Sequence, residues 1–162
     1  MNLDYANNEF LISISGYYSN FNGLLVVGSL TITSNKQQFG PYGTRQNGEY
    51  FSTSSTDGKI VGFFGRSGWY LDSIGAYLEP LGGNGPFGGT GGIKFDDGTH
   101  KTVKKIAVRH GDGANGFVSI QTVYVDDKGN ESWLGVRGTH GGGVVTEVSP
   151  LQTTPYLLNI EV

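Results

Sequence analysis

The segment Gly68-Trp69-Tyr70-Leu71-Asp72 combines a glycine, an aromatic pair and a lone carboxylate, and these groups together could recognise a hydroxyl-rich ligand. A carboxylate accepts charge-assisted hydrogen bonds from two adjacent hydroxyls. Backbone amides on a tight loop donate hydrogen bonds in return, and an aromatic face can cover the apolar side of a ring. The alternative is that Asp72 only caps its own turn. The spacing alone does not decide between these two interpretations.

Asp96 and Asp97 are the other acids that an enzyme could place beside such a pocket, since glycosidases use two carboxylates. The sequence Phe-Asp-Asp-Gly at 95–98 is typical of a turn that follows a strand, so we expect both acids to be solvated turn residues. The three histidines lack ligand-like spacing, no serine-nucleophile motif occurs and the chain has no cysteine. We therefore predict neither an enzyme nor a site that requires a metal or cofactor.

The composition favours many short strands joined by tight turns. Glycine accounts for 28 of the 162 residues and charged residues for only 15%, while β-branched and aromatic residues are frequent. The net charge of −3 and the lack of a basic run argue against a nucleic-acid partner. No apolar run approaches the roughly 18 residues of a membrane span. No secretory signal follows Met1, so we expect a cytoplasmic or nucleocytoplasmic protein, with secretion left open.

A unit of strand, glycine-rich loop and strand occurs three times, at residues 9–33, 59–78 and 104–125. The second strand carries Ser-Leu or Ser-Ile at a matching place in each unit, namely at 29–30, 73–74 and 119–120. Each unit is followed by a second glycine-rich piece that leads into another strand, at 40–52, 85–98 and 139–148. We therefore predict three four-stranded antiparallel sheets with approximate threefold symmetry around a shared core.

The end of the chain resembles its beginning, because residues 153–162 are similar to residues 6–15. We expect residues 1–148 to form a single domain. Residues 149–162 would then add an extra strand that resembles residues 3–15. Such a strand could mediate assembly by strand exchange, and a homo-oligomer is expected.

The sequence from about Leu3 to Val148 resembles the jacalin-related plant lectins. The resemblance rests on GPYG, GFFGRSGWYLDSIGAYL and GGTGGIKFDDG, which begin at Gly40, Gly62 and Gly88 respectively. It implies an all-β, β-prism I fold. The segment order departs from the family, in which the GPFGG…FDDG piece opens the domain and DSIGAYLEP closes it. The chain thus resembles a circular permutant with a joint near 81–85, or a stretch across the boundary of two tandem copies.

The resemblance implies a sugar-binding site without metal. In it, Asp72 accepts hydrogen bonds from two hexose hydroxyls, and the amides of Trp69 and Tyr70 on the loop that starts at Gly68 donate to the sugar. We expect one of the two aromatic side chains to be partly exposed at the rim of the site. The amide of Gly92 reaches a further hydroxyl, and Gly91 permits the close approach of the chain.

The expected ligands are glycans that contain mannose or glucose. Galactose binders of the family place an aromatic residue where this chain has Leu24, and they rely on cleavage before the glycine that matches Gly92. Leu24 and the continuous GGTGGIKF sequence favour mannose or glucose, with galactose as the alternative. We expect the loop 22–24 to form a third side of the pocket.

The loop pattern recurs at residues 110–115 and 140–143, which makes these segments a candidate for a second site. Its candidate residues are Gly111, Asp112, Asn115 and Gly142. Neutral Asn115 stands in the place of the acid, and Asp112 could compensate for it. Two other functional interpretations stay open: an assembly module that works by strand exchange, and an engineered permutant.

Overall fold

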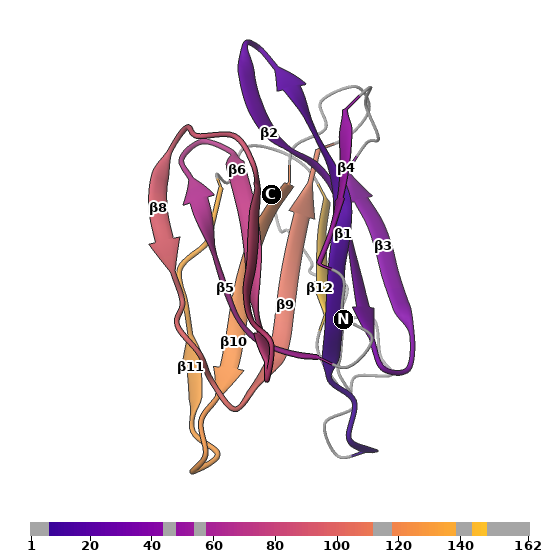
Figure 1. Ribbon diagram of the computed structural model, residues 1–162, viewed down its shortest axis with the longest axis vertical. Helices are drawn as coiled ribbons and strands as arrows, with labels where there is room; N and C mark the ends of the chain where they lie inside the picture. The colour runs from indigo at the N-terminus through magenta and orange to yellow at the C-terminus, as the bar shows by residue number, and fades with distance from the viewer. Residues whose placement is uncertain (1–6, 44–47, 54–57, 112–117, 139–143, 149–162) are drawn as a thin grey trace, which may run out of the picture.

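The computed structural model describes residues 7–43, 48–53, 58–111 and 118–138, together with the backbone of 144–148. The first sheet contains β1 (Leu11–Phe21), β2 (Leu24–Ser34), β3 (Gln38–Gly43) and β4 (Glu49–Ser52) in the antiparallel order β3-β2-β1-β4. Figure 1 shows these strands on one side of the molecule, with β1 and β2 joined at its upper end.

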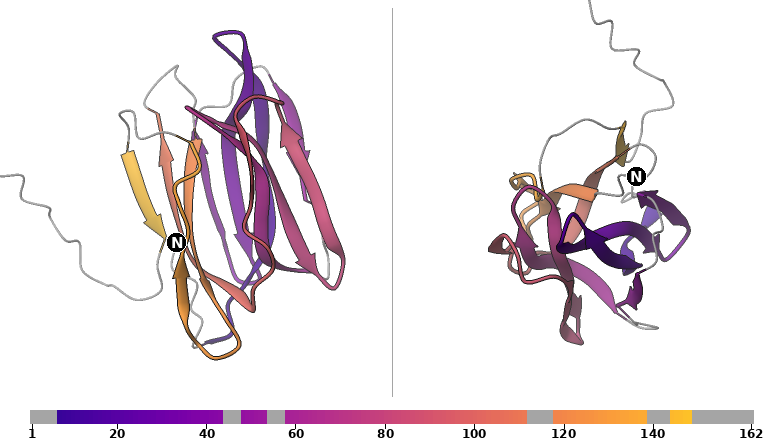
Figure 2. Two further views of the ribbon diagram at one scale, coloured as in Figure 1. Left: turned by 90° about the vertical axis from the view of Figure 1, so that its left-hand side faces the viewer. Right: turned by 90° about the horizontal axis from the view of Figure 1, so that it is seen from above.

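The second sheet repeats this pattern with β5 (Lys59–Ser67), β6 (Leu71–Glu79), β7 (Gly82–Gly88) and β8 (Ile93–Asp96) in the order β7-β6-β5-β8. The third contains β9 (Thr102–His110), β10 (Val118–Val125), β11 (Glu131–Trp133) and β12 (Val144–Val148) in the order β11-β10-β9-β12. The all-β prediction and the three-unit prediction are confirmed, and the end-on view in Figure 2 shows the three sheets around a common centre. The short strand β11 lies outside the pieces that the repeat analysis identified.

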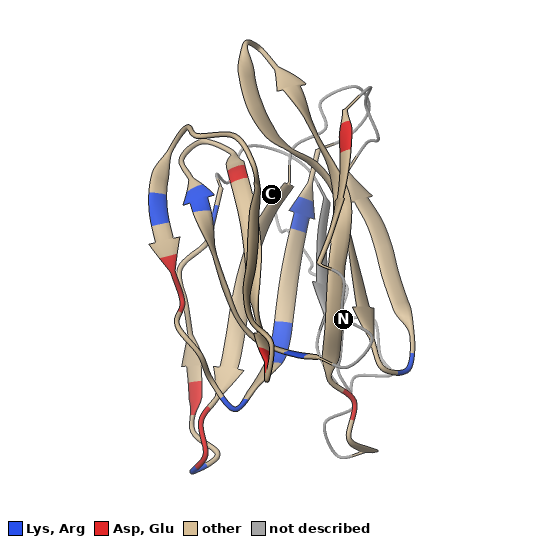
Figure 3. Cartoon of the chain, in the orientation of Figure 1, with Lys and Arg blue, Asp and Glu red and all other residues tan. Residues whose placement is uncertain are grey.

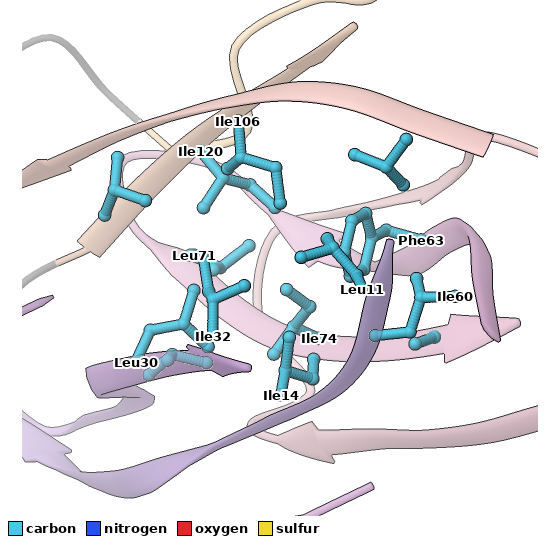
Figure 4. Close-up of a cluster of buried hydrophobic side chains, with 14 of the residues drawn as sticks. Leu11, Ile14, Leu30, Ile32, Ile60, Phe63, Leu71, Ile74, Ile106 and Ile120 are labelled. Atoms are coloured by element: carbon cyan, nitrogen blue, oxygen red, sulfur yellow. The ribbon is translucent and has the colours of Figure 1, made fainter. Parts of the chain in front are cut away.

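The recurring Ser-Leu/Ile step occupies equivalent positions in the three sheets. Ser29, Ser73 and Ser119 are all buried and lie on β2, β6 and β10, the second strand of each unit. The aliphatic residue that follows each serine, at 30, 74 and 120, is at most 2% exposed and belongs to the shared core. Figure 4 shows that side chains from all three sheets meet there. A period of two in each strand thus places the repeated apolar residue on the inner face.

The predicted joint near 81–85 lies inside an ordinary hairpin of the second sheet. β6 and β7 pair in antiparallel register from Leu78↔Gly82 onward. The backbones approach closely here, because a Cβ added at Gly85 would lie 2.7 Å from the Cα of Gly75. The joint therefore continues the sheet, and the segments on its two sides are held by the same ladder.

The expectation that Asp97 is a solvated turn residue is wrong. Its side chain is 2% exposed and forms an ion pair with Arg137, whose Nη2 lies 2.7 Å from Oδ1. The hydroxyl of Tyr124 donates to Oδ2 at 2.8 Å, and the burial of Tyr124 together with this carboxylate raises the pKa of its hydroxyl. Asp97 follows β8, so the pair links the second sheet to the third. Its neighbour Asp96 is exposed, as predicted, and accepts a hydrogen bond from the hydroxyl of Tyr77 at 2.8 Å.

Three connections gather at the upper end of the molecule in Figure 1: β1–β2, β5–β6 and β7–β8. The first two connections join paired strands, whereas β7–β8 joins the two edge strands of the second sheet. All of these strands are held in the sheets, which makes this end a set of loops on a rigid support. The described chain contains no helix long and apolar enough to cross a membrane.

Candidate functional site

Asp72 lies at the second position of β6 and is buried, with an exposed fraction of only 3%. The backbone of Gly91 and Gly92 in the β7–β8 connection covers its carboxylate. A Cβ added at Gly91 would lie 2.5 Å from Oδ1, and one added at Gly92 would lie 2.5 Å from Oδ2. The structure therefore brings together the acid and the glycine pair, which are 19 or 20 residues apart and on opposite sides of the predicted joint.

A side chain is disfavoured at these two positions for different reasons. Gly92 has a φ of +61°, a backbone conformation that disfavours side chains, and an added Cβ would also lie 2.5 Å from the carbonyl carbon of Ser67. At Gly91 only the carboxylate of Asp72 stands in the way. The two glycines thus let a backbone with its amide groups approach the acid more closely than any side chain would allow.

One of the two aromatic side chains in the loop before Asp72 is exposed, as expected, and the other is packed. Trp69 is 79% exposed, whereas Tyr70 is half-buried and packs edge-on against Phe21 at a ring distance of 5.3 Å. The amide of Gly68 donates to the carbonyl of Tyr70 at 3.0 Å, which tightens the loop before Asp72. The loop is therefore fixed at both its backbone and its Tyr70 side chain, and Trp69 projects beyond it.

Leu24 lies on the tip of the β1–β2 hairpin and is 47% exposed. Asn22 and Gly23 turn the chain there with φ values of +50° and +81°, as a tight hairpin requires. The adjacent Leu25 touches the β7–β8 connection, because a Cβ added at Gly89 would lie 2.0 Å from its carbonyl oxygen. The Phe21–Tyr70 ring contact joins the same hairpin to the β5–β6 loop. Leu24 is thus brought to the side of the Asp72 loops.

Burial raises the pKa of the Asp72 carboxyl above its ordinary value. Its own backbone amide, the charge of Arg66 and the amide of Gly68 act in the opposite direction. Figure 3 shows a blue segment near the upper end of β5 and a red segment near the upper end of β6. The site therefore holds a largely desolvated acceptor whose charged form depends on nearby amides and one guanidinium.

Arg66 is a site residue that the sequence analysis missed. Its Nε donates to the carbonyl of Gly91 at 2.7 Å and its Nη2 to the carbonyl of Gly92 at 2.9 Å. The signal was present in GRSG at 65–68, where Arg66 stands two residues before Gly68, but an arginine at a strand end does not by itself indicate a site. Only the pairing of β5 with β8 shows that it faces the glycine loop.

Most of the second predicted site falls outside the described residues, which include neither Asp112, Asn115 nor Gly142. Gly111 is described and is buried at the end of β9. Within the described ranges, no three His, Asp or Glu side chains gather in a way that could hold a metal ion.

Two hollows lie away from the acid. One of about 750 Å³ lies among Lys59, Glu79, His100 and Asp127, near the β6–β7 turn at the other end of the prism. The other, of about 390 Å³, runs along the outer side of β5 and β8 and touches Arg66. Asp72 lines neither of them. We call its carboxylate and the loops around it the Asp72 cup.

A family model described as "Jacalin-like lectin domain" matches residues 1–77 and 84–162. The chain is 44% identical over 90 residues to a "Mannose/glucose-specific lectin" of Parkia platycephala, covering 55% of this chain and 20% of that protein. It is 32% identical over 167 residues to an "Agglutinin" of Castanea crenata, covering 94% of this chain and 53% of the relative. A "Galactose-specific lectin" of Morus indica is 44% identical over 78 residues, which cover 48% of each protein.

The chain thus spans between a fifth and about half of the length of these relatives. The family match itself covers every residue except 78–83. The three-sheet fold agrees with it. The chain belongs to the family of proteins that contain a jacalin-like lectin domain.

Proposed function

We propose that this domain binds a hexose of the mannose/glucose type at the Asp72 cup, without a metal ion and without catalysing a reaction. The observation that carries the proposal is the enclosure of the Asp72 carboxylate by the backbone of Gly91 and Gly92. A buried carboxylate beside a backbone that glycine keeps free of side chains offers fixed acceptors and donors, which adjacent sugar hydroxyls need.

Two features support mannose or glucose over galactose. The position at which galactose binders of the family carry an aromatic residue is the aliphatic Leu24 in this chain, which is 47% exposed. Gly91, Gly92 and Ile93 follow one another in a continuous chain. A galactose preference is the second candidate, and the similarity to the Morus lectin favours it.

Calorimetric titration tests the proposal with three ligands: methyl α-mannoside, methyl α-glucoside and methyl α-galactoside, each with and without a chelator. Heat with the first two sugars, unchanged by the chelator, is the expected result. Heat with the galactoside alone would overturn the sugar assignment. Heat that the chelator abolishes would overturn metal independence, and release of free sugar from an oligomannoside would show an enzyme.

The test variant is Asp72→Asn, which keeps the shape of the side chain but removes its charge. The matched control is Lys94→Gln, which removes a charge from an exposed residue of β8. Binding should be lost in the first variant and kept in the second. A shallow polar site recovers little free energy beyond the cost of its desolvation, so monosaccharide affinity should be weak. Assembly into a homo-oligomer would raise the avidity for branched glycans, and we propose such assembly for the whole protein.

The segment order has two proposed origins, a circular permutation or a boundary between tandem copies. The Castanea alignment runs along 94% of this chain but only 53% of the relative. A stretch of a longer protein therefore matches the segments in the order found here, which supports the tandem origin. The intact mass of the protein isolated from its source distinguishes the two: a mass well above 17.3 kDa supports tandem copies, and one near it supports permutation.

A further inference from the structure

We propose that Arg66 is a positioning residue of the sugar site. By binding the carbonyls of Gly91 and Gly92 on the side of the loop that faces away from Asp72, it orients the amide of Gly92 toward the Asp72 cup. This inference rests on the proposed function for its ligand, but its structural part can be measured without sugar.

The geometry begins with the two hydrogen bonds of the guanidinium. Nε donates to the carbonyl of Gly91 at 2.7 Å, and Nη2 donates to that of Gly92 at 2.9 Å. Two donors of one planar, rigid group thus bind two successive peptide units. Neither unit can rotate without breaking a charge-assisted hydrogen bond.

The direction of the Gly92 amide follows from covalent geometry. In a planar trans peptide, the N–H points opposite to the C=O of the preceding residue. Because the Gly91 carbonyl points toward Arg66, the Gly92 N–H points away from it. The carboxylate of Asp72 lies against the same glycine, since an added Cβ at Gly92 would lie 2.5 Å from Oδ2. These two hydrogen bonds of Arg66, which we call the clamp, therefore act on a peptide that borders the acid.

Such a clamp matters because this loop consists largely of glycine. The sequence Gly88-Gly89-Thr90-Gly91-Gly92 has little intrinsic preference for one backbone conformation, and glycine loses the most freedom on ordering. A donor that is already fixed binds its ligand without that entropic cost. Arg66 also lies near enough to Asp72 for its charge to favour the carboxylate form.

The neighbouring Lys94 gives a matched control. It pairs with Arg66 across β5 and β8, and it lines the same hollow of about 390 Å³ on the outer side of the sheet. It is exposed and also carries one positive charge, but it makes no hydrogen bond to the glycine loop among the described residues. Replacing Lys94 therefore removes a positive charge from this face without removing a hydrogen bond to the glycine loop, whereas replacing Arg66 removes both.

The first experiment measures order at the loop without a ligand. Steady-state ¹⁵N–¹H NOE values for residues 91–93 are compared in the parent, Arg66→Gln, Arg66→Lys and Lys94→Gln proteins. We expect a marked drop in the NOE in Arg66→Gln, a smaller drop in Arg66→Lys, and parent-like values in Lys94→Gln. Because Arg66 borders the open hollow, its truncation leaves no buried cavity, and thermal unfolding checks that the variants stay folded. Parent-like NOE values in a folded Arg66→Gln protein would overturn the proposal.

The second experiment tests the effect on binding by titration with methyl α-mannoside and its 3-, 4- and 6-deoxy derivatives. Arg66→Gln should weaken binding of the complete sugar by roughly tenfold, the scale of one charge-assisted or well-oriented hydrogen bond. The loss should disappear for the 3- or the 4-deoxy sugar, whichever lacks the hydroxyl that the Gly92 amide contacts, and persist for the 6-deoxy sugar. An equal loss for all four ligands would indicate general damage and overturn the positioning role. If the parent binds none of the sugars, the proposed function fails, while the NOE comparison still decides whether Arg66 orders the loop.

Discussion

The carboxylate of Asp72 and the backbone of Gly91 lie so close that a single added methyl group on Gly91 would stand 2.5 Å from Oδ1. This contact joins the start of β6 to the β7–β8 connection, two segments that the β6–β7 hairpin separates in the sequence. It makes the candidate site sensitive to the smallest possible substitutions, and these can be matched with controls elsewhere in the chain.

Gly92→Ala should abolish mannoside binding and destabilise the fold. Its φ of +61° strains any side chain, and the added Cβ would meet both Asp72 and Ser67. Gly98→Ala is the control, since Gly98 has a φ of +70° with nothing within 4 Å of an added Cβ. Both should lose about 1 kcal/mol of stability through backbone strain, with a further loss at Gly92. Calorimetry and urea unfolding measure the two effects, and a Gly92→Ala protein that binds like the parent would contradict the site.

Asp72→Asn should remove sugar binding and leave the protein as stable as the parent, or more stable, at pH 7. Burial raises the pKa of this carboxyl, so its neutral form is favoured in the folded state. The resulting stabilisation is present below the unfolded pKa and is lost as the pH rises through the folded pKa. Thermal unfolding of parent and variant at pH 4 and pH 7 measures this, and a variant that is much less stable at pH 7 would contradict the assignment.

The pH dependence of binding in the parent follows from the same carboxyl. Because its pKa is raised, protonation should weaken mannoside binding as the pH falls, with a midpoint above the ordinary value of 3.8. Titration calorimetry between pH 4 and pH 7 gives the midpoint. Affinity that stays constant over a range where the fold is intact would show that the charged form is not needed.

Asp97→Ala should destabilise the protein by about 3–5 kcal/mol, because it leaves the largely buried Arg137 without its ion-pair partner. Lys104→Ala breaks the partly exposed pair with Glu131 and should change stability by less than about 1 kcal/mol. Urea unfolding compares the two variants. Equal losses in both would mean that the Asp97–Arg137 pair does not hold the second and third sheets together.

Trp69→Ala should keep most of the monosaccharide affinity. The side chain is 79% exposed, and the site is proposed to use the backbone amide, which alanine retains. Trp133→Ala is the control, since Trp133 is the other tryptophan and is 58% exposed on β11, away from the site. Titration of both variants with methyl α-mannoside checks this. A loss above about tenfold in Trp69→Ala alone would show that the indole ring itself contacts the sugar.

The repeated pattern of the chain was sufficient to predict the fold. Alternation with a period of two places one face of each strand inward, and the same Ser-Leu/Ile step recurs in β2, β6 and β10. The short strand β11 was missed because three residues with exposed side chains carry no detectable alternation. Its place is fixed by pairing with β10, a tertiary contact.

The candidate site could be predicted only in part. Asp72, Gly91 and Gly92 were identified through residue types and the family resemblance, and the exposure of one aromatic ring was expected. Arg66 was missed, since the partners of a long, flexible side chain depend on which strand lies beside it. Asp97 was wrongly expected to be solvated, because its ion-pair partner Arg137 is 40 residues away along the chain.

The sequence by itself determined the class of fold, the number of units and the chemical types available to the site. These depend on local periodicity, on turn residues and on the residues themselves. The tertiary structure decided which groups meet: Asp72 with the glycine pair, Arg66 with the Gly91 and Gly92 carbonyls, and Asp97 with Arg137. Such contacts arise from strand register and sheet packing, in which residues far apart in the chain come within a hydrogen-bond length, and no local pattern encodes that distance.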